Sequence, residues 1–142
     1  MNPLRILLAA VGGFVVYFVL GGAIFGLVPS LISEFLKYPG VYRDRQGQMS
    51  HLPVGMAATF LAILVLAVLY AQLYRGGGSG LAQGARFGAL IGLFVVFAFV
   101  LHNYVNMNIG LRLTLQNSAA YFVEWFVTGI VIGLIYRPRV SH

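Results

Sequence analysis

Four apolar stretches dominate the sequence, and each is close to the length that a helix needs to cross a bilayer. A transmembrane helix takes about 20 predominantly apolar residues to cross roughly 30 Å of hydrocarbon. The stretches that meet this requirement are approximately residues 6–28, 53–74, 85–105 and 118–136. The alternation of polar and apolar residues that a membrane β-barrel needs is missing from runs such as Leu61 to Leu69. The sequence therefore predicts an all-α integral membrane protein, a four-helix bundle.

The composition favours lipid over water as the main solvent of the chain. Only 8% of the 142 residues are charged, whereas about 25% are charged in a typical soluble domain. We expect one transmembrane domain over residues 1–142. The formal net charge of +6 indicates contact with anionic lipid headgroups rather than with nucleic acid, because the basic residues flank the apolar stretches.

The connections between the spans differ in character. Residues 29–52 carry a short amphipathic pattern that predicts an interfacial helix after the first span; its apolar positions are Leu31, Ile32, Phe35 and Leu36. Residues 75–80 are rich in glycine and predict a flexible hairpin connection. Arg137 and Pro138 are expected to close the fourth span.

The distribution of basic residues favours a multi-pass membrane protein with both termini in the cytoplasm. Five Lys and Arg residues then lie on the cytoplasmic side and four on the far side. Because this bias is small, insertion in both orientations stays an open alternative.

Every span carries small residues at a four-residue spacing. Such stripes let helix backbones approach closely in lipid. The glycines in these stripes are Gly22, Gly26, Gly84, Gly88, Gly92, Gly129 and Gly133, and the stripe of the second span consists of Ala58 and Ala62. We expect these glycines to pack the four helices within one chain; the alternative is a face that forms a homo-oligomer or joins a larger membrane complex.

Glu124 is the most unusual residue of the predicted spans. It lies about six residues, or roughly 9 Å, into the fourth span. A carboxylate at the centre of a bilayer costs about 2.5 to 3.5 kcal/mol, so such a group is protonated, paired or exposed to a wet cavity. Tyr121 and Thr128 lie on the same helical face. These residues form a candidate proton or ligand site.

His102 is the partner that the sequence suggests for Glu124. It lies about one turn from the end of the third span, on the side where the fourth span begins, and Asn103 and Asn106 extend a polar patch there. A histidine beside a carboxylate is a feature of proton relays. It also serves as an interhelical lock, and both interpretations stay open.

The sequence predicts no catalytic site, metal site or cofactor. Haem with two histidine ligands needs paired histidines within the spans, and His102 is the only histidine in a predicted span. Zinc lacks a sufficient ligand set for the same reason. Only three acidic residues exist, and Glu34 and Asp44 belong to the first loop, so hydrolytic chemistry is not expected.

The layout resembles the small four-span bacterial membrane proteins grouped as the DUF1761 family. The resemblance lies in three segments: the end of the first span at Phe25-Gly26, the series from Gly84 to Gly92, and the stretch from His102 to Gly133. It implies an integral membrane protein of no settled activity.

Three functions are compatible with these features. The first, which we favour, is a non-enzymatic four-helix bundle of the bacterial inner membrane with a structural or accessory role. The second is a small proton-coupled transporter or channel that uses Glu124; small multidrug exporters are similar in having four short spans and one membrane carboxylate, although theirs is in the first span. The third is a lipid- or quinone-binding protein that uses residues 31–38.

Overall fold

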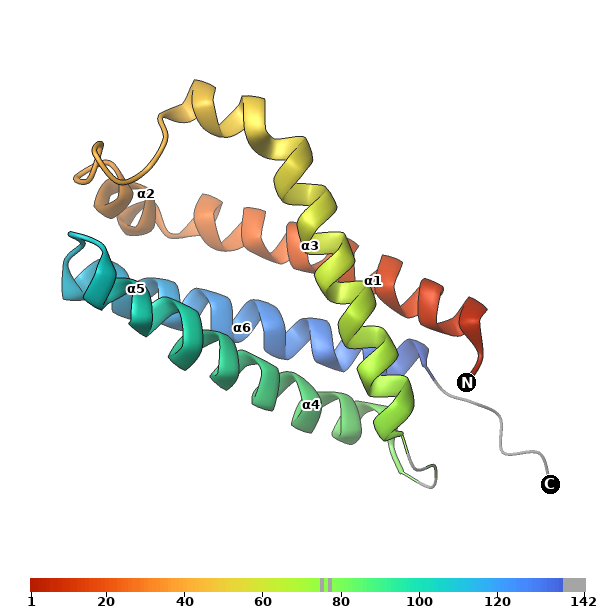
Figure 1. The fold of residues 1–142 in the computed structure, drawn as a ribbon. Coiled ribbons are helices and arrows are strands. Elements are labelled where there is room, and N and C mark those ends of the chain that lie inside the picture. The colour runs from red at the N-terminus through yellow and green to blue at the C-terminus, as the bar shows by residue number, and fades with distance from the viewer. Residues whose placement is uncertain (75, 77, 137–142) are drawn as a thin grey trace.

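The computed structural model describes residues 1–74, 76 and 78–136, and within them every regular element is helical. The elements are α1 (Pro3–Leu27), α2 (Pro29–Phe35), α3 (Arg45–Leu73), α4 (Gly80–Val95), the π-helical turn η1 (Val96–Val100), α5 (Leu101–Asn106) and α6 (Leu111–Ile135). Figure 1 shows that α4, η1 and α5 form one continuous rod. The predicted all-α fold is confirmed.

Four helical rods are long and apolar enough to cross a membrane. They contain 25, 29, 27 and 25 residues, and their most apolar windows have mean hydropathies of 1.7 to 2.5. Only 11 to 33% of each window is buried inside the chain. Because apolar side chains cover most of the outer surface, the solvent that matches it is hydrocarbon. The protein is a multi-pass helical membrane protein.

All four long helices begin earlier than hydropathy predicts, and the difference is largest for α3 and α6. The third helix of the structure, α3, starts at Arg45 rather than near residue 53, because the Asp44 carboxylate accepts a hydrogen bond of 2.7 Å from the backbone N–H of Gly47 and caps the helix. Similarly, α6 starts at Leu111 rather than near residue 118. The predicted end of the last span at Arg137 and Pro138, and residues 75 and 77 of the glycine-rich connection, lie outside the described residues.

Glycines bring α4 and α6 into backbone contact. A Cβ atom on Gly84 would lie 2.6 Å from the carbonyl oxygen of Gly129, and one on Gly88 would overlap the carbonyl of Phe126. At the same contact between α4 and α6, Gly92 packs against Phe122, and Gly133 packs against Gly84. We name this contact the glycine seam. These glycines therefore pack helices within one chain.

Gly22 and Gly26 are also predicted to pack helices together, but they do not. A Cβ atom on either would meet nothing within 4 Å. The reason is rotational: α1 turns Gly13 and Gly21 toward α6, and each residue advances about 100° around a helix. Gly22 and Gly26 therefore do not pack against another helix.

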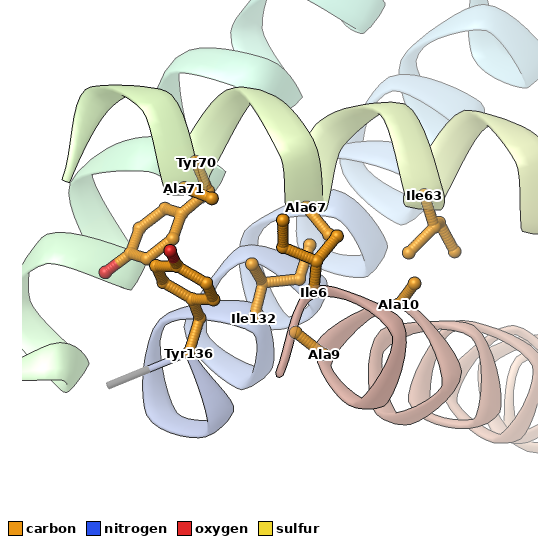
Figure 2. Close-up of a cluster of buried hydrophobic side chains, with 9 residues drawn as sticks. All are labelled: Ile6, Ala9, Ala10, Ile63, Ala67, Tyr70, Ala71, Ile132 and Tyr136. Atoms are coloured by element: carbon orange, nitrogen blue, oxygen red, sulfur yellow. The ribbon is translucent and has the colours of Figure 1, made fainter. Parts of the chain in front are cut away.

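A cluster of small and aromatic side chains joins α1, α3 and α6 at the end of the molecule where α1 begins and α6 ends. Figure 2 shows its members, which are Ile6, Ala9, Ala10, Ile63, Ala67, Tyr70, Ala71, Ile132 and Tyr136. Only the C-terminal half of α3 takes part. Its N-terminal half diverges from the other helices, and residues 48–58 are all exposed.

The short helix expected after the first span is present as α2, which is tied to the start of α6. The Glu34 carboxylate is 2.6 Å from Lys37 Nζ and 3.4 Å from Arg112 Nε. The Tyr38 hydroxyl accepts a hydrogen bond of 2.9 Å from the backbone N–H of Gly110. These contacts attach the segment between α1 and α3 to the start of α6. They therefore fix the position of α1 relative to α6.

Candidate binding site at Glu124

Glu124 lies near the middle of α6 and is nearly inaccessible. The helix has 25 residues, and Glu124 is about 20 Å from its first residue at 1.5 Å per residue. Its exposed fraction is 3%. The distance of about 20 Å is counted from the start of the helix at Leu111, whereas the predicted 9 Å is counted from the start of the apolar stretch near residue 118.

The carboxyl group of Glu124 faces α1. Its side-chain hydrogen-bond partner is the hydroxyl of Tyr17. A Cβ atom on Gly21 would lie 2.9 Å from Glu124 Oε1, so the carboxyl group occupies the space that glycine leaves on α1. Among the described residues, both ion pairs use Glu34, and no Lys, Arg or His pairs with Glu124.

A hollow of about 220 Å³ surrounds this carboxyl group, and we name it the acidic pocket. Its lining residues are Tyr17, Phe18, Gly21, Gly22, Phe25, Tyr121 and Glu124. Four of the seven are aromatic, and the faces of aromatic rings attract cations. A carboxylate among aromatic rings is a suitable environment for an organic cation.

His102 is not the partner of Glu124. It is exposed on α5, whereas Glu124 is buried against α1. The π-helical turn ends at the buried residue Val100, and His102, two residues later, lies about 200° farther around the helix. His102 therefore points away from the buried side of its helix, and the predicted pair is not formed.

The other predicted site residues are divided between different environments. Tyr121 lines the acidic pocket together with Glu124. Thr128 is fully buried, but it packs on Gly13 of α1 and does not line the pocket. Asn106 is exposed, and Asn103 lines a different hollow. The structure thus brings Glu124 and Tyr121 together at one hollow, and Tyr121 and Asn103 together at the other.

The sequence interpretation missed the contribution of α1 to this site. Tyr17, Gly21 and Phe25 all line the acidic pocket. Their four-residue spacing places them on one helical face, which is a signal that the sequence does contain. The rotation that turns this face toward Glu124 is set by helix packing and has no local signal.

A second hollow, which we name the apolar groove, has a volume of about 600 Å³. It lies between α3, from Ala62 to Leu69, and the α4–η1–α5 rod, from Ile91 to Asn103. Trp125 of α6 also lines it. Tyr17 and Tyr121 line both hollows, so these two residues lie between the groove and the acidic pocket.

The fold and these hollows define a class of protein: a multi-pass helical membrane protein with a buried carboxyl group at the middle of a span. Residues 8–133 match the model of the family described as protein of unknown function DUF1761. The chain belongs to this family, as its layout suggested. No curated protein and no solved structure matches the chain.

Proposed function

We propose that this protein is a non-enzymatic membrane protein that binds a small organic cation at Glu124 in exchange for a proton. One observation carries the proposal: Glu124 is 3% exposed, is surrounded by four aromatic residues, and has no basic partner among the described residues. Proton-coupled transport of such a cation is the activity that this exchange supports.

The exchange follows from the cost of burying a charge. An ionised carboxylate in hydrocarbon is unfavourable by about 2.5 to 3.5 kcal/mol unless its charge is compensated. The titratable groups against it are Tyr17 from α1 and Tyr121 from α6, and neither supplies a positive charge. Either a proton or a bound cation must therefore neutralise Glu124, and each displaces the other.

The setting of the proposal is the bacterial inner membrane, with both termini in the cytoplasm and with anionic lipids around the basic residues. Exposed cationic side chains at the α2 end support the lipid contact, since the Lys37 and Arg112 side chains are 57% and 68% exposed. The ligand enters the acidic pocket from the bilayer.

Equilibrium binding of benzyltrimethylammonium to the protein in lipid nanodiscs tests the proposal. This quaternary cation carries no acidic N–H, so any pH dependence comes from the protein. We expect saturable binding that strengthens as the pH rises and is lost in Glu124→Gln. The matched control is Asp44→Asn, which removes an exposed acid but keeps a good helix cap. If Glu124→Gln binds benzyltrimethylammonium as tightly as the natural protein does, Glu124 is not the cation site.

A pair of glycine variants tests the pocket itself. Gly22 and Gly26 both have open space where a Cβ atom would be, but only Gly22 lines the acidic pocket. The first carbon of a new side chain is therefore accommodated at either position. We expect Gly22→Leu to weaken cation binding about tenfold or more, equivalent to at least ~1.4 kcal/mol, and Gly26→Leu to leave it unchanged. The same affinity in both variants would place the cation elsewhere.

A further inference from the structure

We propose that the apolar groove is a second binding site, which takes a neutral membrane quinone: a flat ring with carbonyl oxygens and an apolar tail. The inference concerns a different hollow and a different ligand from the cation site at Glu124. It depends on the shape, the walls and the charge of the groove.

The walls of the groove are apolar and partly aromatic. Phe94 and Phe99 from the α4–η1–α5 rod line it, and both are more than half exposed, at 60% and 56%. Trp125 lines it from α6. Aromatic side chains of this kind stack on a flat ring.

The length of the groove fits a ring with a tail. Its wall on one rod extends from Ile91 to Asn103, or about 18 Å along the helix. Asn103 lies in the last turn before α5 ends at Asn106, so this end is near the membrane surface. Ile91 lies at the deep end, among apolar residues. The π-helical turn Val96–Val100 forms part of this wall, and such turns are frequent at functional sites.

The polar residues of the groove favour a ring carbonyl. Phe99 and Asn103 both line the groove, and their four-residue spacing places them side by side on the helix. They offer an aromatic face for stacking and an amide N–H that donates a hydrogen bond.

The charge of the groove favours a neutral ligand. Its polar lining residues are Asn103, Tyr17 and Tyr121, and no charged residue is among the described residues that line it. A charged lipid headgroup would find no opposite charge there, whereas a quinone needs none.

Trp125 makes the groove directly observable. It is the only tryptophan of the chain, and it lines the apolar groove but not the acidic pocket. Titration of decylubiquinone into the protein in nanodiscs, followed by quenching of tryptophan fluorescence, measures binding. We expect saturable quenching that Glu124→Gln leaves unchanged, so that this proposal and the cation proposal fail separately.

Two alanines of α3 provide matched variants. Both Ala58 and Ala62 are exposed, but only Ala62 lines the groove. We expect Ala62→Leu to weaken quinone binding about tenfold and Ala58→Leu to have no effect; Asn103→Leu should weaken it as well, through loss of the hydrogen bond.

Two results would overturn the proposal. One is quenching that rises linearly with quinone concentration and is equal in all variants, which would mean partition into the bilayer only. The other is the combination of two observations: decylubiquinone gives no saturable quenching, whereas a phospholipid with brominated acyl chains does, and Ala62→Leu reduces that quenching by the phospholipid. That result would assign the groove to a lipid acyl chain.

Discussion

At the scale of single residues, two glutamates with the same burial have different surroundings. Glu34 and Glu124 are each 3% exposed. Glu34 is compensated by Lys37 and Arg112, whereas Glu124 has a phenol hydroxyl from Tyr17 and no cation among the described residues. A compensated buried acid stabilises the junction that it forms, and an uncompensated one remains available for a ligand.

Replacing Glu124 with glutamine should not destabilise the protein. Glutamine has nearly the same shape, it still accepts a hydrogen bond from the Tyr17 hydroxyl, and it removes the penalty of a buried charge. We expect the Tm of Glu124→Gln in detergent to be equal to or higher than that of the natural protein. The free energy of unfolding should change by no more than about 1 kcal/mol. A Tm well below that of the natural protein would instead support the interhelical-lock interpretation of this residue.

Replacing Glu34 with glutamine should have the opposite effect. The change leaves Lys37 and Arg112 without the carboxylate that they share. Because both cations are more than half exposed, water compensates part of the loss, and we expect about 1 to 2 kcal/mol of destabilisation. Thermal unfolding in detergent at low and high salt measures it. A Glu34→Gln variant as stable as the natural protein would show that the junction contributes nothing.

At the scale of elements, hydropathy predicted the number and order of the spans but not where the helices begin. Hydropathy detects only the apolar part of a helix. The backbone hydrogen bonds of the helix continue into the neighbouring polar residues, so the helix begins before its apolar part does. Asp44 is a local signal for the start of α3, since it caps the helix. The start of α6 has no side-chain cap of its own; Tyr38, far away in sequence, bonds to Gly110 there.

The glycine seam between α4 and α6 permits a test with a single methyl group. A Cβ atom on Gly88 would overlap backbone atoms of Phe126, which cannot move aside as a side chain does. We expect Gly88→Ala to separate the two helices and lower the Tm by an amount equivalent to about 1 to 3 kcal/mol. The control is Gly26→Ala, which has open space and should be neutral or slightly stabilising. Equal Tm values for the two variants would contradict the seam.

At the scale of the whole molecule, the chain's physical class was predictable from composition, and its candidate site only in part. Glu124 stood out because an acid is rare among apolar residues. Its true neighbours on α1 were missed and His102 was wrongly assigned, because helix rotation depends on packing across the whole chain. The π-helical turn, which changes the face that His102 occupies, has no clear sequence signal.

The two ends of the described chain lie at the same end of the helical rods. Figure 1 shows the start of α1 and the end of α6 at the same end of the molecule, with α2 and α5 at the other. The chain has no cysteine, so single cysteines introduced at Asn2, Asp44, Ser79 and Asn108 can be labelled one at a time with an impermeant maleimide. We expect positions 44 and 108 to react from outside the cell and positions 2 and 79 to be protected. Labelling of all four positions from outside would indicate insertion in both orientations.

If a proton and an organic cation compete for the carboxyl group of Glu124, binding of the cation must release the proton. Benzyltrimethylammonium is added to the protein in weakly buffered nanodiscs while a pH dye records the proton balance. We expect binding to release protons from the natural protein and from Asp44→Asn, and no protons from Glu124→Gln. Saturable binding without proton release at any pH from 5 to 9, or release that persists in Glu124→Gln, would contradict it.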